Sequence, residues 1–240
     1  MPNGASTAAS IVYYTDHHLP AELALLCRTQ LVRAAQGREI VAVGLGSMTG
    51  FPVGSTACNL VHVAERGILT MHRQILTGLE NATGDIVYLC EHDVLYSPTH
   101  FDIVPARADT WTYNVHVWHA RYPDGHAVFY NAQQVSGLVA YRSLLLDYYR
   151  ARIAQIEREG PNRHYEPGLK QSVGSKQVVN AWSLYPNVDV RHDRNWTASK
   201  WSRADFRNGV YARGWREADE LPGWGDLRNV FAAAHAGRGV

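Results

Sequence analysis

The chain has 240 residues, which is enough for one substantial α/β domain or two small ones. Hydrophobic residues make up 46% of the chain and charged residues 19%, a globular balance that excludes wholesale disorder. The formal net charge of +1 excludes a long-range attraction to nucleic acid or to an acidic membrane, but it does not exclude a local basic patch.

The first half of the sequence predicts strands that alternate with helices. Residues 11–14 form a short apolar strand, and an apolar helical stripe follows from Pro20 until Gly37. Residues 39–43 form a second strand that ends in a glycine-containing loop, residues 44–50. This strand–helix–strand order is typical of a parallel sheet with helices packed on both faces.

A second helix is expected over residues 64–81, and a continuous apolar run, residues 86–90, follows it. A run of this kind is typical of a central parallel strand that is covered on both faces. The strand would deliver Glu91-His92-Asp93 to the carboxyl edge of the sheet, which is where open α/β sheets bind ligands.

Regular structure becomes harder to predict toward the C-terminus. Residues 111–119 alternate like one strand, and residues 127–130 are placed to pair with it across the turn at residues 122–125. Residues 137–160 indicate a strand end that continues into a long helix, and the portion from Pro161 onward is rich in loops. We therefore predict a single domain over residues 11–240, after a leader of residues 1–10.

The cysteines of this chain indicate a reducing compartment, and its hydropathy indicates that the chain does not cross a membrane. Cys27, Cys58 and Cys90 are far apart and show no spacing typical of a disulfide framework or a zinc site. No apolar stretch reaches the roughly 20 residues that span a bilayer, so we expect no transmembrane segment. Residues 1–10 also lack the pattern of a secretory signal. The expected location is the cytoplasm.

The two carboxylates of Glu91-His92-Asp93 are the chemical signal of this sequence. They are two residues apart, so they would share one side of an extended chain. Carboxylate oxygens are the ligands that Mn²⁺ and Mg²⁺ prefer, and such an ion keeps positions free for the oxygens of a diphosphate. The alternative is a solvated acidic loop after a strand.

The segment around this motif resembles a known family. Residues 78–94 contain a helix end, then Ala82-Thr83-Gly84-Asp85, an apolar strand and Glu91-His92-Asp93, and this order resembles the core of family 2-like glycosyltransferases with the GT-A fold. Residues 135–142 resemble the segment that follows the motif in that family, near the acceptor site. The resemblance covers residues 10–195. Glu91 and His92 depart from the usual Asp-x-Asp pattern, which leaves Asp93 as the surer metal ligand.

The resemblance implies a fold, an activity and a set of site residues. The fold would be GT-A-like, with residues 11–100 binding the nucleotide-sugar and residues 101–240 forming the acceptor side. The activity would be a hexosyltransferase-type transfer from a UDP-sugar to a hydroxyl acceptor, with Mn²⁺ or Mg²⁺ as cofactor. The residues that it places around the donor are Tyr14, Thr15, Asp16, Ser47, Arg73 and His92.

Two further residues are expected to complete the site. Residues 188–192 indicate a strand that ends at His192, and many enzymes of the resembled fold add a C-terminal histidine to the metal or to the diphosphate. The metal ligands expected are thus Glu91, Asp93 and His192. Glu166 follows the long helix, roughly where the family carries an acidic base, and it would deprotonate the acceptor if the reaction inverts the anomeric centre.

The stretch 191–216 interleaves basic and aromatic residues, a composition that can bind a phosphate backbone and stack on bases. A DNA-modifying glycosyltransferase that acts on hydroxymethylated pyrimidines is therefore one alternative. In the other interpretation these arginines bind the donor diphosphate, and the tryptophans stack on sugars or pack the loops. Two further alternatives are a sugar-nucleotide nucleotidyltransferase and a non-catalytic module that binds nucleotides or nucleic acid.

Overall fold

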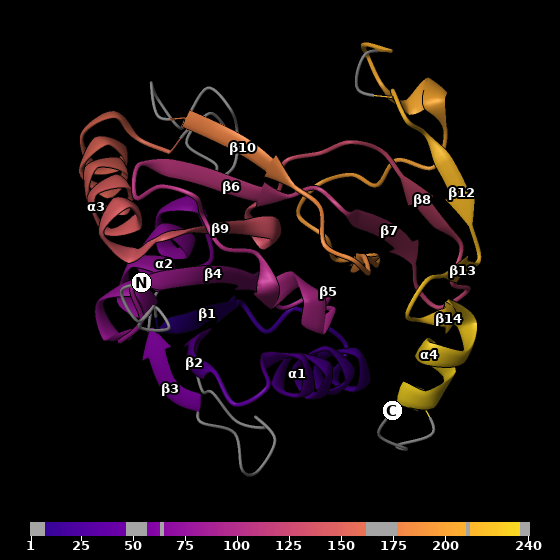
Figure 1. Cartoon of the computed structure of the whole chain (residues 1–240), viewed down its shortest axis with the longest axis horizontal. Helices are drawn as coiled ribbons and strands as arrows, with labels where there is room; N and C mark the ends of the chain where they lie inside the picture. The colour runs from indigo at the N-terminus through magenta and orange to yellow at the C-terminus, as the bar shows by residue number, and fades with distance from the viewer. Residues whose placement is uncertain (1–7, 47–56, 63–64, 162–176, 210–211, 236–240) are drawn as a thin grey trace, which may run out of the picture.

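The computed structural model describes residues 8–46, 57–62, 65–161, 177–209 and 212–235. Most of its strands belong to two sheets. The first has seven strands in the order β10-β6-β9-β4-β1-β2-β3, and the second has five in the order β12-β8-β7-β11-β5. Figure 1 shows the first sheet beside helices α1, α2 and α3, with β7, β8 and β12 on the other side of the molecule.

The first sheet is parallel except at one strand. β1 pairs in parallel with β2 and β4, and β2 with β3, while β9 runs antiparallel to both β4 and β6. Its strands are β1 (Ala9–Thr15), β2 (Glu39–Leu45), β3 (Ala57–His62), β4 (Ile86–Glu91), β6 (Thr110–Asn114), β9 (Leu138–Tyr141) and β10 (Gln177–Ala181). The predicted α/β class with a mostly parallel central sheet is confirmed.

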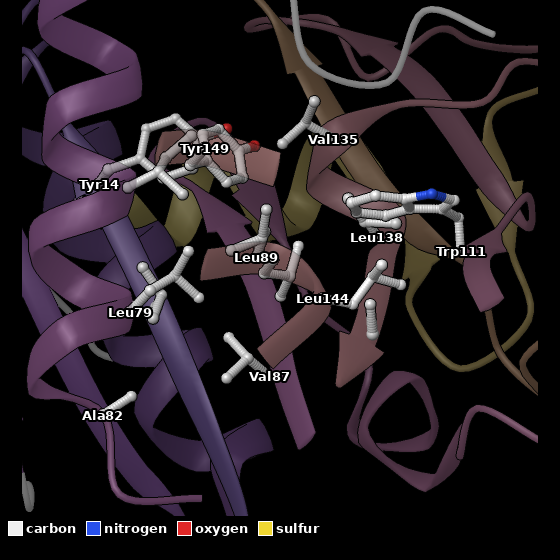
Figure 2. Close-up of a cluster of buried hydrophobic side chains, with 14 of the residues drawn as sticks. Tyr14, Leu79, Ala82, Val87, Leu89, Trp111, Val135, Leu138, Leu144 and Tyr149 are labelled. Carbon is white, nitrogen blue, oxygen red and sulfur yellow. The ribbon is translucent and has the colours of Figure 1, made fainter. Parts of the chain in front are cut away.

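Helices cover both faces of this sheet because the side chains of β1 alternate between two apolar clusters. Ile11 and Tyr13 pack in the cluster that contains α1 (Ala21–Ala35), while Val12 and Tyr14 pack in the cluster that contains α2 (Ile68–Asn81) and α3 (Arg142–Glu159). Figure 2 shows the second cluster, where Leu79 of α2 lies over the sheet near Val87 and Leu89.

The second sheet joins short segments from the middle and the end of the chain. β11 pairs in parallel with β7 and antiparallel with β5, and β8 pairs antiparallel with β7 and β12. Its strands are β5 (Val94–Leu95), β7 (Val117–Arg121), β8 (Ala127–Phe129), β11 (Asn187–Arg191) and β12 (Arg216–Ala218). β13 (Glu220–Leu221) and β14 (Gly225–Asp226) form a hairpin before α4 (Leu227–His235), and short 3-10 turns lie at Pro98–Asp102, Val135–Gly137 and Arg203–Asp205.

The single strand that the sequence predicts over residues 111–119 is two strands in different sheets. Asn114, which is fully buried, accepts hydrogen bonds on its side-chain oxygen from the backbone N–H groups of His116 and Ser183, at 3.1 and 3.3 Å. These bonds turn the chain after β6 and send it into β7, which does pair with β8 as expected. Among the described helices, none is long and apolar enough to cross a bilayer.

Candidate functional site

A cavity of about 320 Å³ opens at the carboxyl ends of β1, β2 and β4 and reaches across to β11 of the second sheet. The position is the one that sequence analysis predicts for ligand binding in an open parallel sheet. The described lining residues come from six segments: Tyr14–Asp16, Leu45, residues 66–74 in part, Glu91–Asp93, residues 133–135, and residues 189–197 in part.

Glu91, His92 and Asp93 all line this cavity, but their side chains point to different partners. β4 ends at Glu91 and a turn follows, so the two carboxylates do not share one side of a strand. The Tyr14 hydroxyl donates to Glu91 Oε1 at 2.7 Å, and burial, followed by the negative charge of Glu91, raises the pKa of Tyr14 well above its usual value. Figure 2 shows Tyr14 beside Tyr149 on this side of the sheet. The Glu91 carboxylate is thus fixed by a hydrogen bond from a tyrosine of the hydrophobic core.

Asp93 instead faces the segment that follows β11. The side-chain amide of Asn195 donates to Asp93 Oδ2 at 2.9 Å, and His192 Nε2 lies 3.8 Å from the same oxygen. The side chain of His192 is 2% exposed, and its Nε2 has no hydrogen-bond partner among the described residues. His192 directly follows β11, as predicted.

The tautomer of His192 follows from its other ring nitrogen. Nδ1 accepts a hydrogen bond from the backbone N–H of Arg194 at 3.2 Å, so a neutral ring carries its proton on Nε2. A histidine that binds a metal through Nε2 instead donates from Nδ1. The arrangement suits a hydrogen-bond donor to an anion. Within the described part of the chain, no three His, Cys, Asp or Glu side chains are grouped closely enough to hold a metal by themselves.

Asp16, directly after β1, contacts side chains of two other segments of the chain. His92 Nδ1 lies 3.5 Å from Asp16 Oδ1, and Arg66 pairs with Asp16 Oδ2. Burial raises the pKa of Asp16, but His92, a backbone hydrogen bond from His18 and the Arg66 guanidinium together outweigh burial, and the net shift is downward. The Arg66 guanidinium also lies over the ring of Trp196, 4.7 Å from its centroid, which brings residues 194–197 to the cavity rim.

Gln74 is a cavity residue that sequence analysis missed. It is 3% exposed on α2, and its side-chain amide donates to the carbonyl oxygens of Thr15 and Val43, at 2.9 and 3.3 Å. It therefore ties the carboxyl ends of β1 and β2 together next to the predicted residue Thr15. The signal available in the sequence was a polar residue inside the buried stripe of the helix.

Asp189 is a second residue that sequence analysis missed. This carboxylate lies on β11, is 4% exposed and lines the cavity. Its Oδ2 accepts from His119 Nδ1 at 3.1 Å and from the Gln134 amide at 2.9 Å. Among the described residues, Oδ1 has only the Arg191 guanidinium as a partner, at 3.4 Å. Burial raises the pKa of Asp189, but Arg191 and His119 outweigh it, so the carboxyl is held ionised.

Beside this carboxylate, the oxygen of the Gln134 amide is buried and has no hydrogen-bond partner among the described residues. Gln134 lines the cavity as well. Arg191 anchors the other side of the group, because its guanidinium donates to the backbone and side-chain oxygens of Thr197 and to the Ser199 hydroxyl. The end of the cavity formed by the second sheet is thus rich in hydrogen-bond acceptors.

The remaining predicted residues lie elsewhere or outside the description. Arg73 is exposed on α2 and forms an ion pair with Glu157 of α3 at 2.7 Å, and it is not among the residues that line the cavity. Ser47 and Glu166 lie outside the described residues. In the stretch 191–216, Arg191, Arg194 and Trp196 line the cavity, whereas Phe206 and Trp215 pack against Tyr130.

No family description and no curated protein matches this chain. Among solved structures, it is similar to residues 1–349 of TarS from S. aureus, with 10% identity and a TM-score of 0.49 over 76% of this chain and 60% of that one. It is also similar to the glycosyltransferase GlyE of Streptococcus pneumoniae TIGR4, with 13% identity and a TM-score of 0.48 over 73% and 45%.

A third similar structure is TarS 1–349 in complex with UDP-GlcNAc, with 8% identity and a TM-score of 0.48 over 81% of this chain and 62% of that one. The chain thus spans less than two thirds of each of these proteins. Scores of this size describe a likeness of chain path and assign no activity.

Proposed function

We propose that this protein transfers a sugar from a nucleotide-sugar donor, a UDP-sugar, to a hydroxyl acceptor with the help of Mn²⁺ or Mg²⁺. The observation that supports the proposal is the set of groups brought together at one cavity. Polar groups at the ends of β1 and β2, Asp93 after β4, and the acceptor groups of Asp189 and Gln134 all line it, and His192 lies beside Asp93 without being among the lining residues. These groups match the chemistry of a nucleoside, a diphosphate and a sugar.

The nucleoside would bind at the ends of β1 and β2. Asp16 is a cavity-lining carboxylate whose lowered pKa keeps it ionised, and it is suited to accept hydrogen bonds from a ribose or a base. Gln74 and Thr15 form the buried floor beside it. Trp196 is 58% exposed at the rim and offers a ring on which a base can stack.

The diphosphate would lie on the cavity side of Asp93, next to which His192 is placed. Asp93 fits a hard cation, because its carboxylate is hydrogen-bonded at one oxygen by Asn195 and lines the cavity. When bound, such a cation neutralises the negative charge that develops on the leaving diphosphate. His192 would donate its Nε2 proton to a phosphate oxygen, which gives that buried atom the partner it lacks.

The sugar would bind at the second-sheet end. Asp189 Oδ1 and the Gln134 amide oxygen are acceptors with unused capacity, and sugar hydroxyls are donors that match them. Asp189 is poorly suited to act as a general base, because its lowered pKa reduces its affinity for a proton. We therefore assign it to sugar binding, and Glu166 keeps its predicted role as the base of an inverting reaction.

In the reaction, the acceptor oxygen forms a bond to the anomeric carbon of the sugar. The bond from that carbon to the diphosphate oxygen breaks, and its electron pair leaves with the nucleoside diphosphate. The acceptor proton passes to a base, for which Glu166 is the candidate. Asp189 and Gln134 would hold the sugar, and His192 would hold the leaving group.

The proposal is tested first by ligand binding. We expect UDP with Mn²⁺ at about 100 times its Kd to add about 2.7 kcal/mol to the free energy of unfolding, which raises the Tm by about 5–10 °C. The substitution Asp93→Ala should abolish the Mn²⁺-dependent part of this shift. Asp109→Ala, an exposed carboxylate on the loop before β6, is the matched control and should leave the shift unchanged.

The second test is turnover. Wild-type protein incubated with UDP-sugars and Mn²⁺ should release UDP, and Asp93→Ala should not. A Tm that no nucleotide or nucleotide sugar changes, with or without Mn²⁺, would refute the proposal. Binding of UDP that persists unchanged in Asp93→Ala, without any UDP release from wild type, would identify a nucleotide-binding module instead of an enzyme.

A further inference from the structure

A second hollow lies in the C-terminal portion, outside the donor cavity. It has a volume of about 350 Å³ and is open to solvent. Its lining residues are Arg203, Gly209, Ala212, Arg213, Gly214 and Trp215, so two arginines and one tryptophan supply its chemistry. No carboxylate is among the described residues that line it.

The two guanidinium groups have no ion-pair or hydrogen-bond partner among the described residues. The neighbouring carboxylates form their hydrogen bonds with other groups. Asp205 accepts hydrogen bonds from the backbone N–H groups of Trp201 and Ser202, and Glu217 accepts from the Trp215 ring N–H at 2.8 Å. The described lining of the hollow therefore contributes two positive charges and no negative one, although the whole chain has a net charge of only +1.

A stack of rings connects this hollow to the donor cavity. Trp215 lies parallel to Tyr130 with ring centroids 6.1 Å apart, and Tyr130 lies parallel to His119 at 4.2 Å. His119 in turn donates to Asp189, the carboxylate assigned above to the sugar. The hollow is thus separated from the sugar end of the cavity by two stacked rings.

An exposed aromatic ring adjoins the same surface. Trp182 is 53% exposed and stacks on His116 through one face, with centroids 4.4 Å apart. Its ring also packs at an angle of 59° against that of Phe129, with centroids 5.6 Å apart, and Phe129 lies against Gly214 of the hollow. Positive charge beside an exposed ring is the combination that binds single-stranded nucleic acids, because arginines neutralise phosphates while rings stack on bases.

We propose that the hollow formed by Arg203, Arg213 and Trp215 binds a phosphate of a single-stranded nucleic acid, and that this nucleic acid presents the acceptor hydroxyl to the donor cavity. The assignment of the acceptor rests on the proposed function, whereas binding at the hollow does not. The two-ring separation places the phosphate-binding hollow next to the sugar end of the cavity, where the acceptor must approach.

The test is fluorescence anisotropy of a short, fluorescein-labelled single-stranded DNA at several salt concentrations. We expect wild-type protein to bind it, with affinity falling steeply between about 50 and 200 mM salt. The double variant Arg203→Ala/Arg213→Ala should bind at least about 10-fold more weakly. Its slope of log K against log salt should be shallower by about 0.7, because the hollow binds one phosphate and each single-strand phosphate contact contributes about 0.7.

Two further variants make the test specific. Arg33→Ala/Arg150→Ala removes two exposed arginines from α1 and α3 and changes the net charge equally, and it should bind like wild type. Trp182→Ala should weaken DNA binding because a base can no longer stack on this ring, and it should leave the slope of log K against log salt unchanged. Equal loss in both double variants, or no binding by wild type, would overturn the proposal.

Competition separates nucleic acid from other polyanions. Unlabelled single-stranded DNA should displace the probe at a lower phosphate concentration than inorganic polyphosphate does. Equal displacement, together with an unchanged affinity in Trp182→Ala, would show a general polyanion site and contradict the assignment to nucleic acid.

A last measurement separates this proposal from the proposed function. Arg203→Ala/Arg213→Ala should keep the Tm shift that UDP and Mn²⁺ produce. DNA binding by a wild-type protein that binds no nucleotide would refute the transferase proposal and the acceptor role that rests on it, but not binding at the hollow. Nucleotide binding without DNA binding would refute the inference about the hollow and leave the transferase proposal standing.

Discussion

Asp189 is an ionised side chain that the fold keeps almost wholly out of water, and burying a charge is costly unless donors surround it. His119, Gln134 and Arg191 supply those donors, yet within the part of the chain that the structure describes Oδ1 has a single long contact of 3.4 Å. A carboxylate that served structure alone would gain from a complete set of partners. Because Asp189 also lines the cavity, this unused acceptor capacity favours ligand binding at this point.

The first prediction contrasts the two ends of the cavity. Asp189→Asn should lower the affinity for the UDP-sugar by about 10–100-fold, which corresponds to the loss of a charged hydrogen bond of about 1.5–3 kcal/mol, and should leave the affinity for UDP unchanged. Asp16→Asn should lower the affinities for UDP and for the UDP-sugar by the same factor. Calorimetric titration of both ligands measures this. Equal weakening of UDP and UDP-sugar in Asp189→Asn would show a structural role instead.

His100 is fully buried, and its burial lowers the free energy of unfolding as the pH falls. Burial lowers the pKa of His100 to about 3, so the unfolded chain, with a pKa of about 6.5, binds the proton first as the pH falls. Its contribution to stability is complete above about pH 6.5 and is lost as the pH falls toward 3, by about 1.4 kcal/mol per pH unit.

The substitution His100→Gln should therefore flatten the dependence of the free energy of unfolding on pH between 6 and 4 by up to about 1.4 kcal/mol per pH unit. Urea unfolding at several pH values measures it. His18→Gln removes an exposed imidazole and serves as the control. An identical flattening in both variants would contradict the assignment to burial.

At the scale of elements, α2 approaches β1 closely at Gly78. A Cβ atom at this position would overlap the side chain of Val12, which is fully buried and cannot move away. Gly78→Ala should therefore destabilise the protein by about 1–3 kcal/mol, although alanine is the better helix former. Thr77→Ala, on the partly exposed side of the same helix, should be neutral or slightly stabilising, and thermal unfolding compares the two. A higher Tm in Gly78→Ala would show that the helix can shift.

The elements that sequence analysis predicted are those whose signal is local. β1, β2 and β4 are continuous apolar runs, and His192 could be placed because Val188 and Val190 mark the strand before it. β3 was not predicted, and the break between β6 and β7 depends on the side-chain hydrogen bonds of Asn114 to a residue far along the chain. Such a bond leaves no pattern in the local sequence.

The candidate site divides in the same way. Asp93 was predicted because it follows a buried strand at the carboxyl edge of the sheet, a position that local sequence reveals. Asp189 was missed because its place in the cavity depends on β11 lying between β5 and β7, segments that are distant in sequence. Gln134 and Gln74 were missed because a glutamine has no typical spacing, and only the fold shows what its amide contacts.

At the scale of the whole molecule, neither sheet forms the cavity alone. One wall comes from the first sheet and its helix, with Asp16 directly after β1 and Gln74 on α2, while β11 of the second sheet supplies Asp189 and Arg191. Contact between the sheets at the site runs through β5, which continues the chain from Asp93 and pairs with β11. A donor that spans the cavity should therefore stabilise both sheets at once, because it binds only when both walls are in place.

Hydrogen exchange measured by mass spectrometry can test this coupling. A UDP-sugar with Mn²⁺ should slow exchange in peptides that cover residues 12–18 and also in peptides that cover residues 187–197. The peptide of α3, which lies outside the cavity lining, should be unaffected. UDP alone should protect the first region fully and leave the amides around Asp189 less protected, because it has no sugar to place there. Protection confined to residues 12–18 with the complete donor would mean that the second sheet does not contact the ligand, and Asp189 would lose its assigned role.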